Sequence, residues 1–253
     1  METTWEELAP GVLRLRLPGW DETVGAVAGP EGVLVVDAGP TLDEGERVRL
    51  DLRRRLGLPV THVVITHPHF DHVLGVGAFP GAEVYGAAGL SELLARDRPL
   101  LVEDAVRYGV DRRAAQEAAD AMILPRHGVS GEVTLDLGGG REVMLANLGP
   151  AHTAHDVAVL VPGLGGMTPE VVFCGDLVEE SGEPQTGPDA HLSWWPAALD
   201  RLLDLGGPDA RYVPGHGAVV DAGFVRAQRD ALAARAAAEG QAAPGPGSAG
   251  GAA

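Results

Sequence analysis

The 253-residue sequence is poor in cysteine and has no long apolar run. Its single cysteine, Cys174, excludes a disulfide within the chain. No apolar run reaches the roughly 20 residues that a membrane-spanning helix needs. The N-terminal residues 1–7 are acidic and lack the basic and apolar regions of a signal peptide, so we expect a cytoplasmic protein without a membrane partner.

Basic residues are scarce as well. The chain has 19 basic residues against 36 acidic ones, which gives a formal net charge of −17. Nucleic-acid binding depends on neutralising phosphates with basic side chains, so this balance argues against a nucleic-acid partner. Solubility explains the acidic excess without any basic partner.

The apolar residues that are present, 45% of the chain, suffice for a substantial core. Strand and helix patterns alternate in two blocks, about 10–90 and 130–238, which predicts sheets flanked by helices. The segment of about 89–126 has no strand signal and is predicted to form two or three helices, either a lid over a site or an insert far from it. The uncharged tail 240–253 is predicted to be disordered, which leaves residues 1–239 as one domain.

One short segment, Thr66–His72, contains three histidines and one aspartate directly after the apolar run Val63–Ile65. Neutral imidazole and carboxylate are the ligands that suit zinc and related divalent metals. Four such groups in six residues are hard to explain as core or as surface. This segment is therefore the first candidate for a metal site.

Four other strand ends carry one histidine or aspartate beside glycine or proline: Asp37, His152, Asp176 and His216. Glycine permits the tight backbone that turns a side chain out of a strand end. Seven residues can then be pooled as candidate metal ligands: His67, His69, Asp71, His72, His152, Asp176 and His216. A catalytic zinc needs about three protein ligands, so this set suffices for two metals if one carboxylate bridges them.

These motifs resemble those of the metallo-β-lactamase superfamily of hydrolases. The His-x-His-x-Asp-His motif is complete, and the later single His, the Asp and the final His follow in the family's order, over roughly Val12 to Gly217. The resemblance implies an α/β (α+β) fold. Two mixed β-sheets would pack face to face as an αββα sandwich, with helices outside and metals at one edge.

The resemblance also implies a role for each ligand. The first metal would be bound by His67, His69 and His152, the second by Asp71, His72 and His216, and Asp176 would bridge the two in a glyoxalase-II-like set. Two Zn²⁺ ions fit these ligands, as Fe²⁺ or Mn²⁺ would. Asp37 and Asp156 would orient ligands from behind without binding metal.

The implied activity is that of a zinc-dependent hydrolase in which a metal-bound hydroxide cleaves a small ester, lactone, thioester or amide. Asp71 could orient the nucleophile and move its proton. Three alternatives stay open: a β-lactam-hydrolysing enzyme, a mononuclear-iron persulfide dioxygenase-like enzyme and a non-catalytic metal-binding relative. True β-lactamases usually carry Cys or Ser in place of Asp176 and are exported, dioxygenases use fewer ligands, and degenerate relatives lose ligands.

The expected partner is a small-molecule substrate, and the sequence does not fix the oligomeric state. Four residues are candidates for the substrate pocket: Trp20, His155, Trp194 and Trp195. The adjacent tryptophans could equally anchor the following helix to the core. His155 could instead be a surface or helix-cap residue, since the family usually has glycine at that position.

Overall fold

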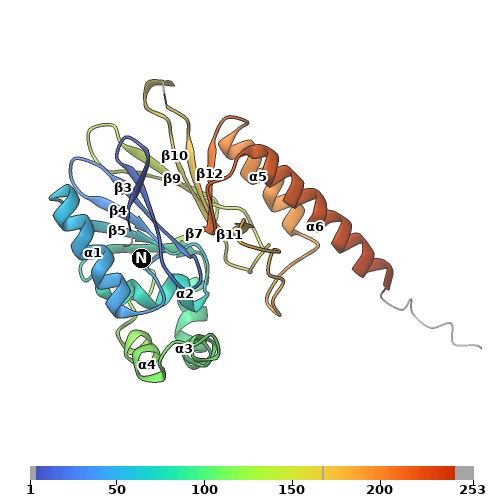
Figure 1. Ribbon diagram of the computed structural model, residues 1–253, viewed down its shortest axis with the longest axis horizontal. Helices are drawn as coiled ribbons and strands as arrows, with labels where there is room; N and C mark the ends of the chain where they lie inside the picture. The colour runs from blue at the N-terminus through green and yellow to red at the C-terminus, as the bar shows by residue number, and fades with distance from the viewer. Residues whose placement is uncertain (1–3, 167, 243–253) are drawn as a thin grey trace, which may run out of the picture.

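The computed structural model describes residues 4–166 and 168–242. Two β-sheets pack face to face, with α1 to α4 on the outer side of one sheet and α5 and α6 on the outer side of the other (Figure 1). This arrangement is the αββα sandwich that the family resemblance implied. Within the described residues, no helix is both long and apolar enough to cross a membrane.

The first sheet has seven strands in chain order, from β1 to β7. Neighbours from β1 to β4 are antiparallel, and those from β4 to β7 are parallel. The strands are β1 Glu6–Ala9, β2 Val12–Arg16, β3 Thr23–Ala28, β4 Val33–Val36, β5 Val60–Val64, β6 Glu83–Ala87 and β7 His127–Val129.

The second sheet has five strands in the order β12-β11-β10-β9-β8. All its neighbours are antiparallel except β11 and β12, so both sheets are mixed. The strands are β8 Glu132–Asp136, β9 Glu142–Asn147, β10 Val157–Val161, β11 Val171–Glu179 and β12 Arg211–His216.

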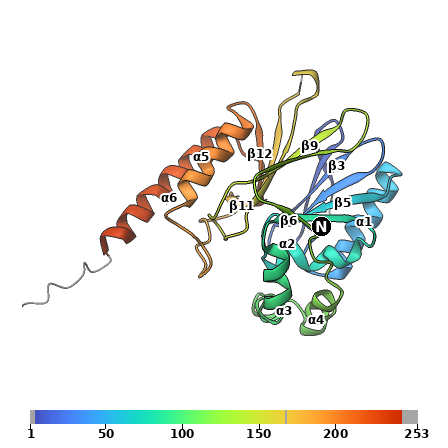
Figure 2. The same ribbon diagram turned by 180° about the vertical axis from the view of Figure 1, so that it is seen from behind.

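The helices lie on the two outer faces, as the view from behind also shows (Figure 2). Sequence signals mark their ends: α1 begins after Thr41, whose hydroxyl accepts from the Glu44 amide, and ends at Gly57 with a left-handed φ of 72°. The helices are α1 Leu42–Leu56, α2 Phe70–Val73, α3 Leu90–Arg107, α4 Arg112–Ala121, α5 Trp195–Gly206 and α6 Ala222–Ala242, with short 3₁₀ turns at Leu74–Ala78 and Leu164–Gly166.

Three apolar layers hold the sandwich together. Side chains alternate along each strand, so Val63 on β5 packs toward α1 to α4 while Val64 packs toward the second sheet. A third layer, which includes Trp195 and Leu199, joins the second sheet to α5 and α6. A sheet covered on both faces needs apolar residues on both, which explains the continuous run Val33–Val36 in β4.

The structure differs from the sequence-based expectations at several ends. Strands β1 and β7 were not predicted, because each is short and carries polar residues or glycine. Strand β11 continues to Glu179, so Asp176 lies within a strand of irregular register and not at a strand end as expected. Helix α6 runs to Ala242, past the predicted start of the tail at 240, and residues 243–253 lie outside the described part of the chain.

Candidate metal centre

All seven candidate ligands converge at one edge of the sandwich, in two adjacent groups. The ligand atoms of each group lie within 4.8 Å of one another. The first half of the chain supplies four ligands from the loop after β5 and the start of α2, and the second half supplies three. The groups are His67, His69, His152 and Asp176, and Asp71, His72 and His216.

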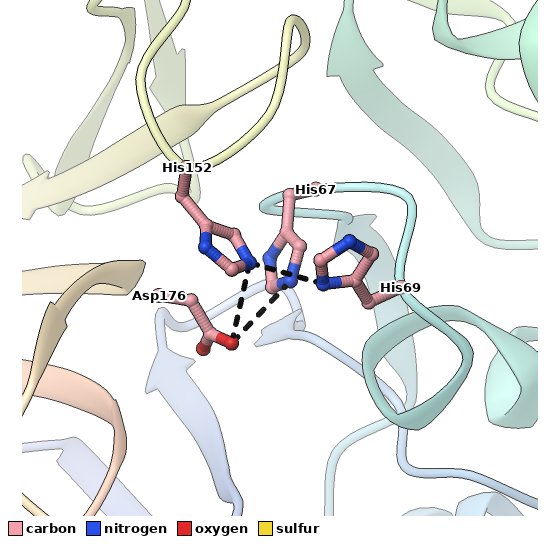
Figure 3. Close-up of side chains that lie close together, drawn as sticks. All are labelled: His67, His69, His152 and Asp176. Atoms are coloured by element: carbon pink, nitrogen blue, oxygen red, sulfur yellow. Dashed lines mark hydrogen bonds and ion pairs between the residues drawn. The ribbon is translucent and has the colours of Figure 1, made fainter. Parts of the chain in front are cut away.

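In the first group, three imidazoles lie together beside the Asp176 carboxylate (Figure 3). Asp176 Oδ2 lies 3.6 Å from His67 Nε2 and 3.5 Å from His152 Nε2. His152 Nε2 is also 3.0 Å from His69 Nδ1. The residues reach this point from three elements, the loop after β5, the turn before β10 and strand β11.

The second group lies directly beside the first. Asp71 Oδ2 is 3.3 Å from His216 Nε2 and 3.7 Å from His72 Nε2. Asp176 reaches this group too, with Oδ1 3.3 Å from His72 Nε2 and Oδ2 3.5 Å from His216 Nε2. Its carboxylate thus faces both groups, as a bridging ligand would.

The second nitrogen of every histidine in these groups has a partner outside the two ligand groups. His72 Nδ1 lies 2.9 Å from Asp37 Oδ2, and His216 Nδ1 donates to the Trp20 carbonyl at 2.8 Å. The remaining contacts are His152 Nδ1 to the Gln185 carbonyl (3.3 Å), His69 Nε2 to Asp189 Oδ2 (3.0 Å) and His67 Nδ1 to Thr66 Oγ1 (3.0 Å). Such partners fix the tautomer and the ring orientation of metal-binding histidines.

Asp37 and Asp156 hold the two ligand-bearing turns. The Asp37 carboxylate accepts from both the amide and the hydroxyl of Thr66, each at 2.8 Å, besides contacting His72. Asp156 accepts from the amides of Ala151 and Thr153 and from the Thr153 hydroxyl, which closes the turn that carries His152. Neither aspartate is a member of the two ligand groups.

Charges in the two groups follow from burial and from the carboxylates. Burial lowers the pKa of His67 well below its usual value and that of His152 to about 4, so both imidazoles are neutral, as metal ligands must be. Burial also opposes protonation of His72 and His216, but nearby carboxylates, Asp176 foremost, raise the pKa of His72 well above its usual value and that of His216 to about 12. The same carboxylates would stabilise bound cations.

Several buried atoms at the centre suit a divalent cation. Within the described residues, His67 Nε2, His72 Nε2 and Asp176 Oδ1 are buried and have no hydrogen-bond partner. Leaving such atoms unpaired is costly, and coordination would satisfy all three. The two groups therefore suggest a dinuclear metal site, with imidazole and carboxylate ligands that suit zinc, iron or manganese.

Glu22, which the sequence analysis did not single out, lies behind the second group. It is fully buried, and neither carboxylate oxygen has a hydrogen-bond partner within the described residues. An isolated antiparallel bridge pairs Glu22 with His216, which places the two side chains on the same face. Burial raises the pKa of Glu22 well above its usual value. Nothing in its local sequence signals this position, because the bridge joins residues almost 200 positions apart.

A pocket of about 450 Å³ opens over the metal centre. Among the residues proposed for substrate contact, Trp20 lines it. Its lining is made by Trp20, His69, Phe70, Asp71, Asp104, Arg107, Tyr108, His152, Asp176, Glu179, Ser181, Gln185, Thr186, Gly187, Pro188, Asp189 and His216.

The other three substrate candidates lie elsewhere. Trp195 is buried in the core, donates from its indole N–H to the Leu177 carbonyl at 3.0 Å, and packs edge-on against His152. Trp194 is 60% exposed at the start of α5, and the His155 ring lies close to Gly89. None of the three is among the described residues that line the pocket, so their role in substrate contact stays a prediction.

Comparison with known families decides the classification. The model of the metallo-beta-lactamase superfamily matches residues 17–216, most of the chain. This chain belongs to the metallo-β-lactamase superfamily. The resemblance that the motifs carried is thereby confirmed, and the superfamily's His and Asp ligand positions are intact in this member.

Relatives of known name extend this comparison. The superfamily member described as metallo-beta-lactamase domain-containing protein 1, from Xenopus laevis, is 31% identical over 204 residues, which cover 78% of this chain and 71% of the relative. A linear primary-alkylsulfatase of Pseudomonas sp. (strain ATCC 19151) is 37% identical over 57 residues, 22% of this chain but only 11% of that protein.

Among solved structures, a metallo-beta-lactamase from Pontibacter korlensis superposes with a TM-score of 0.72, covering 91% of this chain and 99% of that one. Its sequence is 21% identical, so this likeness speaks for the fold alone. The two mixed sheets with flanking helices are thus the metallo-β-lactamase fold.

Proposed function

We propose that this superfamily member is a dinuclear metal-dependent hydrolase that cleaves a small ester, lactone, thioester or amide. The observation that carries the proposal is the complete ligand set, in two adjoining groups that share Asp176. Membership of a superfamily named for hydrolases supports it. The reaction needs no serine or cysteine nucleophile, and Cys174 is buried away from the pocket lining.

We propose two zinc ions as cofactors, held by the first and second groups with Asp176 between them; iron or manganese would fit the same atoms. When bound, the ions supply Lewis acidity, which makes water a nucleophile at neutral pH and polarises a scissile carbonyl. The partners behind the histidines keep the ligand nitrogens aimed at the ions.

In this proposal Asp71 has a second role besides binding metal. It lies on the pocket floor, and although burial opposes ionisation, His72 and His216 lower its pKa, so it is a carboxylate at neutral pH. A carboxylate there orients the attacking water and accepts its proton, then returns the proton to the leaving group.

The pocket size supports a small-molecule substrate. The net charge of −17 opposes a nucleic-acid partner.

The test combines metal content with turnover. Metal-loaded protein is assayed on p-nitrophenyl esters, lactones, thioesters and nitrocefin, alongside Asp71→Ala and the exposed control Asp209→Ala. We expect two equivalents of metal, turnover of at least one acyl substrate, and a loss of about 100-fold or more in kcat for Asp71→Ala alone. Two bound equivalents without any turnover, and with Asp71→Ala unchanged in every property, would overturn the proposal.

A further inference from the structure

One wall of the pocket is built from three aromatic side chains: Trp20, Phe70 and Tyr108. The Trp20 and Phe70 rings meet edge-on with centroids 5.7 Å apart, and the Phe70 and Tyr108 rings stack at 5.7 Å with an interplanar angle of 19°. They come from the β2–β3 turn, the start of α2 and the end of α3. These three residues are called the aromatic wall below.

The aromatic wall begins at the metal centre and runs outward. Phe70 stands between the ligands His69 and Asp71 in the chain and is buried, whereas Tyr108 is 57% exposed. Tyr108 therefore has ring surface left for a ligand after stacking on Phe70. The three rings line the same pocket as the ligands Asp71 and His216.

The charges around the pocket are mostly negative. Beyond Asp71 and Asp176, the lining includes Asp104, Glu179 and Asp189. Apart from the imidazoles, Arg107 is the one cationic side chain among the described lining residues. Its Nη1 lies 2.9 Å from Asp104 Oδ1, so its charge is already paired. A carboxylate on the outer end of a substrate would find no unpaired cation there.

We propose that the pocket selects substrates whose acyl group is neutral and aromatic, such as an arylacetyl group, and discriminates against acyl groups that end in a carboxylate. This inference rests on the proposed hydrolase function. Tyr108 determines the preference for an aromatic ring on the acyl group. The Arg107–Asp104 ion pair determines the discrimination against an acyl group that ends in a carboxylate.

Binding of metal-chelating hydroxamates tests the preference without any need for turnover. The probes are phenylacetohydroxamate and acetohydroxamate, titrated into the metal-loaded protein. We expect the wild type to favour the phenylacetyl probe about 10-fold, and Tyr108→Ala to lower this ratio about 5- to 10-fold by weakening the aromatic probe alone. Tyr108→Phe retains the ratio, and so does the control Leu100→Ala, a 65% exposed residue of the same helix outside the pocket lining.

A third probe, succinyl monohydroxamate, tests the discrimination against carboxylates. It resembles acetohydroxamate but ends in a carboxylate. The wild type is expected to bind it several-fold more weakly than acetohydroxamate. Asp104→Asn removes the partner of the Arg107 guanidinium. At low salt, this variant should therefore bind the two probes with more similar affinities, while its affinity for acetohydroxamate stays unchanged. An unchanged difference would contradict the assignment of this discrimination to the Arg107–Asp104 pair.

The outcomes separate the inference from the proposed function. Hydroxamate binding with the expected ratios, but no turnover of any acyl substrate and no effect of Asp71→Ala, would support the pocket assignment and overturn the hydrolase. Turnover of esters together with equal binding of both neutral probes, or with a ratio that Tyr108→Ala leaves unchanged, would overturn the inference and keep the hydrolase. Absence of binding by all probes overturns the inference as well. If Tyr108→Ala unfolds, Tyr108→Leu removes the ring but keeps apolar volume.

Discussion

Asp37 adopts a backbone conformation that is uncommon for a residue with a side chain. Its φ is +60°, in the left-handed region, which costs a non-glycine residue roughly 1 kcal/mol or more. Three hydrogen bonds to its buried carboxylate compensate, two from Thr66 and one from His72. The strained residue therefore connects the end of β4 to the ligand loop.

Replacing this carboxylate by an amide should loosen the second metal group. In Asp37→Asn, one side-chain atom becomes a donor facing Thr66 or His72, and both of those groups donate. We expect the affinity for the second metal equivalent to fall about 10- to 100-fold, with a smaller effect on the first. Competition with a chromophoric chelator measures both constants. The control is the exposed Asp209→Asn, and equal second-site affinity in the two variants would contradict the role of Asp37.

Asp156 should make the stability of the metal-free protein depend on pH. Burial raises its pKa to about 7, although the hydrogen bonds from Thr153 act in the opposite direction. A raised pKa means that the folded state binds the proton more tightly, so this contribution is complete below the unfolded value of about 4 and is lost between about pH 4 and pH 7.

Asp156→Asn removes that titration. Relative to the variant, the free energy of unfolding of the wild type should fall by about 4 kcal/mol across this interval and then level off. Chemical denaturation of both proteins at a series of pH values, with a chelator present to keep them metal-free, measures the difference in their free energies of unfolding. Parallel pH profiles of the two proteins would show that the pKa of Asp156 is the same in the folded and unfolded states, which would contradict the raised pKa.

At the scale of elements, the ligands were predictable because of where they stand in the chain. His67, His152 and His216 each follow or end an apolar run, and parallel strand ends gather at one edge of a sheet. The same local pattern revealed Asp37 and Asp176. These patterns involve only a few neighbouring residues, so they can be recognised without knowledge of the tertiary structure.

The parts that the sequence did not reveal depend on distant contacts. Strand β1 exists because Glu6 and Glu7 pair with β2, not because of its own apolar pattern. Whether Trp195 faced the core or the pocket depended on where α5 packs. The Tyr108 ring stacks on the Phe70 ring, although the two residues are 38 positions apart in the chain. The sequence pattern of neither segment indicates this contact.

The segment at the end of β11, which continues into the polar side of the pocket, is hydrogen-bonded to α6. Gln228 is buried there, its Oε1 accepts from the Glu179 amide at 3.0 Å, and its Nε2 donates to the Leu177 carbonyl at 2.8 Å. Both backbone groups belong to the end of β11, close to Asp176. The long last helix thus supports a wall of the pocket that it does not itself line.

Gln228→Ala should therefore destabilise the protein and loosen the end of β11. The buried Glu179 amide loses its side-chain acceptor, at a cost of about 1–3 kcal/mol, whereas the Leu177 carbonyl keeps the hydrogen bond from the Trp195 indole. Hydrogen exchange of residues 177–181 should accelerate more than that of β10. Gln116→Ala, at an exposed position on α4, is the matched control. Unchanged exchange at 177–181 would show that this segment is held by other contacts.

At the scale of the whole molecule, the metal centre joins two halves. Four ligands come from the part of the chain that forms the first sheet and three from the part that forms the second. Hydrogen bonds outside the ligand groups also connect the halves at this edge; they include the bond from the Val157 amide to the Thr66 carbonyl at 2.8 Å and that from the Gly217 amide to the Asp21 carbonyl at 3.2 Å.

Metal removal should consequently weaken the whole fold, because ions held by both halves bind the native state alone. At free metal about 1,000 times the dissociation constant, the stabilisation would be about 4 kcal/mol. Thermal unfolding with and without a chelator measures it, and Asp176→Ala should lose most of the shift. A melting temperature that does not respond to zinc or to chelator would contradict a metal centre shared between the halves.

The strand order has a consequence for how the protein is made. Every strand of the first sheet lies between residues 6 and 129 and every strand of the second between residues 132 and 216, each sheet in an unbroken sequence of neighbours. On the ribosome, the first sheet and its four ligands emerge several seconds before the remaining three, at about 5–20 residues per second. A metal ion that needs ligands from both halves would therefore be bound only after both halves have been synthesised and have docked.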